Sequence, residues 1–190
     1  MGTCLETLIK GIKMKNYVEF TIIKNSEVSP HIIMSKFYNK FHKNYENKNI
    51  GVTFPEYIEN KTLGSKIRLF SDNIDELESI KNIVGNDDYI HCTKIKNTPE
   101  KINEKFYYKK HREKNKQYLI KRFSERHNIG IAESSELYED FEPKKISTPF
   151  VNIKKGNSFF RLFVLKTDKN ENSRKKFNSY GLNSISLPHF

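Results

Sequence analysis

The chain has 190 residues, a formal net charge of +11, 36% hydrophobic residues and two cysteines. This length can bury the core of one large or two small domains, and two cysteines exclude a disulfide framework or a cysteine-based zinc site. No apolar run approaches the roughly 20 residues that cross a bilayer. We therefore expect a globular protein of the reducing cytoplasm that is not inserted in a membrane.

The first half of the chain has the pattern of a small α+β domain. Residues 1–13 precede the first regular element and are expected to form an extension outside the fold. Short runs rich in β-branched and aromatic residues predict strands; they are residues 17–23, 49–54, 66–70 and 89–95. A helix is predicted after Ser29-Pro30, an N-cap residue followed by proline, and another at about 73–83.

The predicted first helix has an apolar stripe with a step of four residues. The stripe is Ile33, Phe37, Phe41 and Tyr45, and it should pack against a sheet. The order β-α-β-β-α-β is typical of a ferredoxin-like (RRM-like) domain. We predict this domain for residues 14–105 and a separate C-terminal domain for residues 106–190.

The second half carries most of the positive charge. Residues 1–105 hold 16 Lys/Arg and 14 Asp/Glu, whereas residues 106–190 hold 18 and 9. Residues 106–127 are the densest stretch, with eight Lys/Arg, two Glu and five aromatic residues. Cationic side chains beside stacking rings favour RNA over an acidic protein surface. A basic helix at 115–127, a helix at 131–142 and strands at 149–153 and 159–166 are predicted.

Several reaction classes have no motif in this sequence. There is no P-loop and no dinucleotide-binding glycine fingerprint. The acidic clusters lack a histidine at ligand spacing, which disfavours a two-metal nuclease. RNA can still be cut without a metal because its 2′-hydroxyl is an internal nucleophile, and a histidine suits the proton transfers.

Of the six histidines, His42 has the position best suited to catalysis. It follows Met34 and Tyr38 at steps of four, at the edge of the apolar face, where a side chain is half packed and half exposed. From spacing alone, a packed or helix-capping histidine is favoured over a catalytic one. The other histidines are expected to cap a helix, pack, contact RNA or lie near the chain end; they are His31, His91, His111, His127 and His189.

Two longer motifs carry a family resemblance. Residues 34–42, MSKFYNKFH, and 49–55, NIGVTFP, resemble the CRISPR endoribonucleases that process type I-F repeat transcripts, the Cas six proteins of subtype F, also called Csy four. The resemblance resumes at Pro149-Phe150-Val151, at residues 160–163 and at Tyr180-Gly181-Leu182, and it ends with Pro188-His189-Phe190. It covers nearly all of residues 14–190.

The resemblance implies an activity and a partner. It implies a ferredoxin-like N-terminal domain and a C-terminal domain whose basic helix enters the major groove of the repeat hairpin. It also implies metal-independent cleavage at the base of the stem, without a cofactor, to a 2′,3′-cyclic phosphate. The enzyme would keep its product and join the other subunits of a type I-F surveillance complex.

The resemblance also assigns roles to individual residues. His42 matches the catalytic histidine, Tyr180 a tyrosine that orients it, and Phe160 the ring that stacks on the lowest base pair, a role that Phe159 could exchange with it. The expected RNA contacts of the basic segment are Lys109, His111, Arg112, Lys121, Arg122 and Arg126.

The chain departs from the family pattern at two positions. Lys154 or Lys155 stands where a catalytic serine is expected, and Ser158 is the nearest hydroxyl. We expect Lys155 or Ser158 to act in catalysis and Lys154 to contact RNA, since a lysine can stabilise charge on the scissile phosphate. Lys109 stands where an arginine is expected, and a lysine cannot form the bidentate fork.

Three functions remain open from the sequence. The leading one is a CRISPR-RNA endoribonuclease that uses His42. The second is a guide-RNA-binding subunit of a CRISPR complex that cuts poorly or not at all. The third, a basic RRM-type protein that binds ribosomes or mRNA, explains the charge but not the paired motifs.

Overall fold

The computed structural model describes residues 14–24, 26–46, 48–100, 102, 104–112, 115–142, 146–168, 176–182 and 185–190. The predicted extension, residues 1–13, lies outside the described residues. The chain forms two compact units: residues 1–110 with 148–190, and residues 111–147. The domain boundary predicted between residues 105 and 106 stays a prediction. None of the helices in the described part of the chain is long and apolar enough to span a bilayer.

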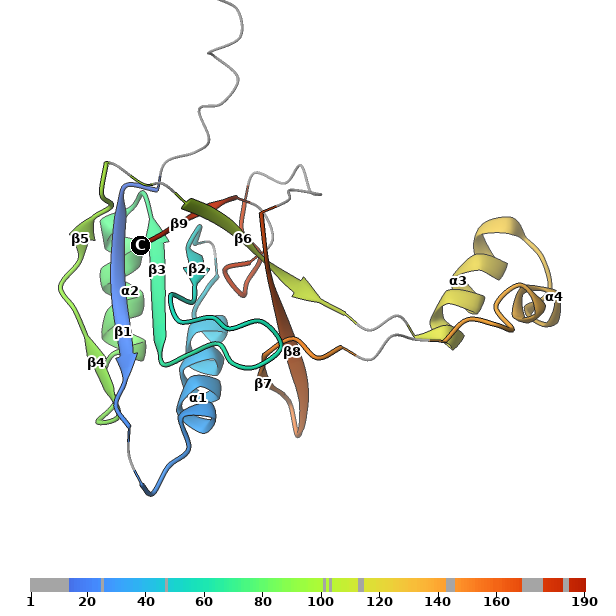
Figure 1. Ribbon diagram of the computed structural model, residues 1–190, viewed down its shortest axis with the longest axis horizontal. Coiled ribbons are helices and arrows are strands. Elements are labelled where there is room, and N and C mark those ends of the chain that lie inside the picture. The colour runs from blue at the N-terminus through green and yellow to red at the C-terminus, as the bar shows by residue number, and fades with distance from the viewer. Residues whose placement is uncertain are drawn as a thin grey trace, which may run out of the picture. The chain divides into compact units, whose positions relative to one another are not determined.

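The first sheet of the larger unit has the predicted ferredoxin-like topology (Figure 1). Its strand order is β2-β3-β1-β4, and the short β5 also pairs with β1. The strands are β1 (Asn16–Ile22), β2 (Gly51–Thr53), β3 (Lys66–Ser71), β4 (Ile90–Cys92) and β5 (Lys96–Asn97). Strand β1 is central because it pairs with β3 on one side and β4 on the other, and its alternating burial shows that one face of the sheet is covered. The α+β class and the order β-α-β-β-α-β are therefore confirmed.

Two helices pack against this sheet, α1 (Pro30–Lys43) and α2 (Ile74–Val84). Helix α2 begins as predicted, with the Asn73 side chain accepting from Asp75 N. Ser29 occupies the N-cap position of α1, but its side chain makes no capping hydrogen bond. The predicted stripe of α1 is buried, and Phe37 lies edge-on to Phe20 of β1, with ring centroids 5.0 Å apart. Helix α1 is thereby held in one orientation on the sheet.

A second sheet in the same unit has the order β7-β8-β6-β9. Its strands are β6 (Glu104–His111), β7 (Phe150–Lys155), β8 (Ser158–Thr167) and β9 (Leu187–His189). Strands β7 and β8 were predicted, and a tight turn at Gly156, with φ +59°, joins them. Strands β6 and β9 were not. Residues 104–111, of which we counted 106–111 only as basic segment, pair through Glu104–Phe106 with β9.

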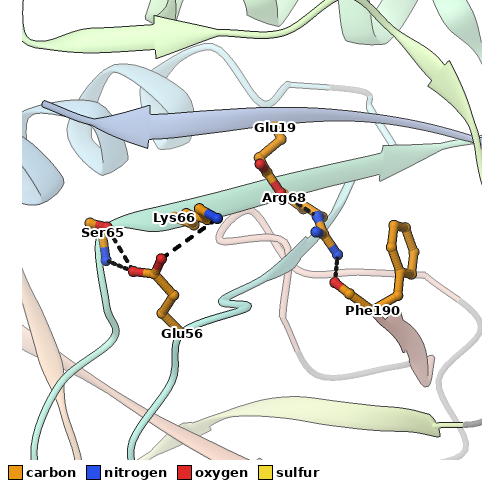
Figure 2. Close-up of polar contacts among 6 residues, drawn as sticks. All are labelled: Glu19, Glu56, Ser65, Lys66, Arg68 and Phe190. Atoms are coloured by element: carbon orange, nitrogen blue, oxygen red, sulfur yellow. Dashed lines mark hydrogen bonds and ion pairs between the residues drawn. The ribbon is translucent and has the colours of Figure 1, made fainter.

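Arg68 of β3 links the two sheets (Figure 2). Its Nε lies 2.6 Å from Glu19 Oε2 on β1, and its Nη1 donates to the main-chain oxygen of Phe190, which follows β9. The guanidinium also covers the Phe190 ring, 4.1 Å from the centroid. Because the Arg68 and Glu19 side chains are only 12% and 17% exposed, the pair is shielded from solvent screening and can hold β9 against the first sheet.

Glu56 fastens the loop between β2 and β3 to the start of β3 (Figure 2). Its Oε2 accepts from Ser65 N at 2.9 Å and Ser65 Oγ at 2.7 Å, and its Oε1 lies 3.7 Å from Lys66 Nζ. The hydrogen bonds from Ser65 lower the pKa of the Glu56 carboxyl. The carboxylate is therefore the form that closes this loop.

The smaller unit is a pair of helices, α3 (Lys116–His127) and α4 (Ile131–Glu136). Asn115 caps α3 by accepting from Tyr118 N at 3.2 Å, and Asn128 ends it in the left-handed conformation, φ +53°. Ile120 is buried, and Phe123 lies edge-on to Tyr138, 5.9 Å away. The predicted basic helix is therefore present, and α4 ends earlier than the predicted residue 142.

Candidate active site

Helix α1 presents His42 at the border between core and solvent. Tyr38, one turn earlier, and its neighbour Phe41 are fully buried, whereas His42 is half-buried. The Nδ1 atom of His42 lies 3.1 Å from the carbonyl oxygen of Ser179. A carbonyl oxygen only accepts hydrogen bonds, so Nδ1 carries the proton and the neutral ring keeps its lone pair on Nε2. Nε2 of His42 can therefore accept a proton.

Tyr180 stacks on the His42 ring. The two ring centroids are 4.3 Å apart and the planes differ by 21°. Tyr38 donates its hydroxyl to the Tyr180 carbonyl at 3.2 Å, and burial raises the pKa of Tyr38 well above its ordinary value, so this hydroxyl keeps its proton. Asn178 Oδ1 accepts from Tyr180 N at 2.9 Å. The main chain of Tyr180, whose ring covers His42, is thus held by a side chain of α1 and by a side chain of its own loop.

The loop after Tyr180 is attached to strand β2. Gly181 has φ +70°, a conformation that favours glycine, and its carbonyl accepts from Val52 N at 2.9 Å. A Cβ atom at Gly181 would lie 2.3 Å from Val52 Cγ2. Strand β2 and the loop with Tyr180 therefore approach as closely as a glycine permits.

A pocket of about 500 Å³ opens beside His42. It is lined by six residues that the sequence singled out: His42, Lys154, Lys155, Ser158, Phe160 and Tyr180. Phe160 lies edge-on to Tyr180, with centroids 6.5 Å apart. Ser158 donates its hydroxyl to the Lys155 carbonyl at 3.0 Å, within the β7–β8 turn. The structure thus brings a histidine, two lysines and two aromatic rings together from α1, the β7–β8 hairpin and the loop at residues 176–182.

Phe159 and Phe160 lie on different faces of the β7–β8 hairpin. Phe160 is half-buried in the His42 pocket, whereas Phe159 is 67% exposed and lines a separate groove. Neighbouring residues of a strand point to opposite faces. The resemblance left it open which of these two rings stacks on the lowest base pair. Only Phe160 lines the His42 pocket.

Sequence reasoning missed Lys110, which also lines the pocket. Its Nζ lies 5.1 Å from the Phe160 ring centroid and 5.0 Å from that of Tyr180. Lys109, which we had selected, is not among the lining residues, and its Nζ lies 6.0 Å from the Tyr107 ring. Recognising residues 104–111 as a strand would have placed Lys109 and Lys110 on opposite faces.

Asn39 joins α1 to the edge strand β7, a contact that sequence reasoning missed. Its Nδ2 donates to Asn152 O at 2.9 Å and to Ser35 O at 2.6 Å. Its Oδ1 accepts from Lys154 N at 2.7 Å. An edge strand has main-chain groups without a neighbouring strand, and here a helix side chain satisfies two of them. The same contact keeps the helix that bears His42 next to the strand that bears Lys154.

The other predicted RNA contacts lie in the smaller unit. Arg112 precedes α3 and is exposed, His111 is half-buried, and Lys121, Arg122 and Arg126 are exposed on α3. Lys121 Nζ is 3.8 Å from Glu125 Oε1, on neighbouring turns. Arg122 and Arg126 are one turn apart, so α3 presents two guanidinium groups on one face.

Side chains that could bind a metal ion do not cluster in the described part of the protein. Among the residues that the structure describes, no three His, Cys, Asp or Glu side chains gather closely enough to hold a metal ion. Asp87 instead contacts two lysines of α1: its Oδ2 lies 2.8 Å from Lys36 Nζ and 3.7 Å from Lys40 Nζ. Burial alone would raise the pKa of Asp87, but its hydrogen bonds and the charges of these lysines lower it overall.

Comparison with known proteins identifies the family. A family model described as CRISPR-associated protein (Cas_Csy4) matches residues 17–190, which include both sheets and every residue of the pocket. No curated protein matched the sequence. The resemblance found from the residues alone is confirmed. The chain belongs to the Cas_Csy4 family of type I-F CRISPR-associated proteins, which bind CRISPR RNA and process it as endoribonucleases.

Proposed function

We propose that this protein cuts precursor CRISPR RNA at the base of the repeat hairpin without a metal ion. The observation that carries the proposal is the His42 pocket. It combines a histidine of defined tautomer, stacked on Tyr180, with the two lysines of the β7–β8 hairpin. These are the groups that cleavage by the RNA's own 2′-hydroxyl requires.

In this mechanism His42 accepts the proton of the 2′-hydroxyl through Nε2. The 2′-oxygen forms a bond to phosphorus as the bond from phosphorus to the 5′-oxygen breaks. The leaving 5′-oxygen takes up a proton from solvent and His42 releases to solvent the one that it accepted, so the products are a 2′,3′-cyclic phosphate and a 5′-hydroxyl, and no water is consumed. Tyr180 is the positioning residue, because its ring limits the rotation of the imidazole.

The lysines take the place of the expected serine. Negative charge develops on the phosphate oxygens as the 2′-oxygen attacks, and Lys155 and Lys154 carry the charge that stabilises it. The Ser158 hydroxyl already donates its proton in a hydrogen bond to the Lys155 carbonyl, inside the β7–β8 turn. This hydrogen bond favours Lys155 over Ser158 as the second catalytic residue. Phe160 would stack on the lowest base pair of the stem, beside Lys110.

Helix α3 is the proposed contact to the groove of the hairpin. Its exposed Lys121, Arg122 and Arg126 support phosphate contacts, with Lys109, His111 and Arg112 nearer the cut. We further propose that the cytoplasmic enzyme keeps the cleaved hairpin and, with it, joins the other subunits of a type I-F surveillance complex.

Arg122→Ala is expected to weaken hairpin binding and to flatten its salt dependence. Each lost phosphate contact should reduce the slope of log K against log salt by about 0.7–0.9. Fluorescence anisotropy over a range of salt concentrations measures the slope. Lys96→Ala is the control, because Lys96 is an exposed cation of β5 in the other unit. Equal slopes for Arg122→Ala and wild type would assign the RNA contact to a different surface.

The proposed reaction is tested with a synthetic RNA of the CRISPR repeat that includes its unpaired flanks. We expect the same cleavage rate in EDTA and in Mg²⁺, and no cleavage when the nucleotide before the cut is 2′-deoxy. Mass spectrometry separates a cyclic phosphate from a linear one by the mass of one water.

Two results would correct the proposal in different ways. Cleavage that requires Mg²⁺ would contradict metal independence. Tight binding of the intact hairpin without any cleavage would show that the chain is a guide-RNA-binding subunit.

A further inference from the structure

A second groove lies between α1 and the β7–β8 hairpin and is not used by the proposed reaction. Its volume is about 520 Å³. It is lined by His31, Ile32, Ser35, Lys36 and Asn39 of α1 and by Asn152 and Phe159 of the hairpin. All of these residues belong to the larger unit.

Two large apolar side chains are exposed in the walls of the groove. Phe159 is 67% exposed and Ile32 is 58% exposed. No acidic residue is among the lining residues. Exposed aromatic and aliphatic walls of this kind fit a flat ligand that has an apolar face.

The polar groups of the groove already bind one another. Ser35 Oγ accepts from Asn152 N at 3.1 Å, and Asn152 Nδ2 lies 3.1 Å from His31 Nε2. Lys36 at the rim contacts Asp87 at 2.8 Å. The floor is therefore preorganised, and recognition by stacking does not require these hydrogen bonds to break.

The groove and the His42 pocket share the same hairpin. Phe159 and Phe160 are consecutive residues of β8, and each lines one of the two hollows. Phe159 pairs in register with Lys154, which is exposed and lines the His42 pocket. Lys154 is thus the cation of the His42 pocket that stands next to Phe159 across the hairpin.

The direction of the RNA follows from the proposed reaction. With the stem on Phe160 and the scissile phosphate at His42, the strand that continues away from the stem is the unpaired RNA on the 3′ side of the cut. We infer that the groove binds a nucleobase of this 3′ segment by stacking it on Phe159. This inference rests on the proposed function.

A nucleic-acid occupant fits the groove better than a protein does. The hollow has room for a small flat ligand rather than for a helix or strand. It lies beside the hairpin end that also borders the proposed cleavage pocket, where Phe159 of the groove pairs with Lys154 of the pocket. Stacking on an exposed ring accepts any base, so it requires no particular repeat sequence.

The test compares two RNAs that cannot be cut, each with a 2′-deoxy nucleotide before the scissile position. One ends at the cut and the other continues with the unpaired 3′ segment. Phe159→Ala should weaken binding of the longer RNA by about 5- to 100-fold and leave that of the shorter RNA unchanged. Phe159→Tyr keeps the ring and should restore binding, whereas Phe159→Leu, which keeps an apolar side chain, should not.

An abasic scan of the 3′ segment then locates the base. At one position, removing the base from the RNA should weaken wild-type binding as much as Phe159→Ala does, and the two changes together should cost no more than either alone. Equal affinities of wild type and Phe159→Ala for the longer RNA would overturn the inference, while His42-dependent cleavage would leave the proposed function standing. Equal losses with both RNAs would also overturn it and would place Phe159 on the stem.

Discussion

His42→Ala is expected to lower the rate of hairpin cleavage by about 10²–10⁴-fold while the affinity for the hairpin stays within a few-fold of wild type. The substitution removes the group that accepts the 2′-hydroxyl proton. It leaves α3 and the hairpin lysines in place, so the contacts that hold the RNA persist. Single-turnover cleavage with enzyme in excess measures the chemical step, and anisotropy with an uncleavable RNA measures binding.

The matched control is His91→Ala. His91 is an exposed histidine of β4, and its loss should leave both the rate and the affinity unchanged. Added imidazole should restore part of the activity of His42→Ala, because a small base can enter the space that the side chain leaves. Wild-type rates in His42→Ala would assign the proton transfer to another residue.

Gly181→Ala is expected to lower the free energy of unfolding by about 2–5 kcal/mol. One part of this cost arises because alanine at φ +70° is strained. The other part is the contact of the new Cβ with Val52 Cγ2 at 2.3 Å, since Val52 is fully buried and cannot move aside without disturbing β2. Urea or thermal unfolding measures the change.

Gly156→Ala separates the two parts. Gly156 also has a positive φ, +59°, but a Cβ there meets no atom within 4 Å. It should therefore cost only about 1–2 kcal/mol. Gly181→Ala should also slow cleavage under conditions where it is still folded, because Tyr180 must move with the loop. Equal losses of stability in the two variants would show that β2 yields to the new methyl group.

The sequence was most informative where the pattern is local. The ferredoxin-like order could be read from β1 and α1 because the burial of a strand or an amphipathic helix repeats every two residues or every three to four. Helix capping in the first half also depends on neighbours that are close in sequence, as at Asn73 and Asp75. The family motif on α1 selected His42, and the motif Tyr180-Gly181-Leu182, in the loop at residues 176–182, selected Tyr180.

Strands β6 and β9 could not be recognised in this way. Residues 104–111 form a strand because β9, more than 70 positions later in the chain, pairs with their first residues. Their own pattern is three consecutive aromatic rings between pairs of charged residues, which a solvent-exposed basic segment shares. For the same reason the sequence could not choose between Lys109 and Lys110, whose directions depend on the strand.

By itself, the sequence determined the α+β class, the basic helix and the family. It also selected His42 and Tyr180, but only as separate candidates. Only the tertiary structure decided that these rings stack, that Ser179, 137 positions from His42, orients the imidazole, and that Phe160 rather than Phe159 lines the pocket. Periodicity reports which face of an element is buried, but not which element covers that face. The pocket depends on contacts between α1, the β7–β8 hairpin and the loop at residues 176–182, and these contacts form only when the core brings the three together.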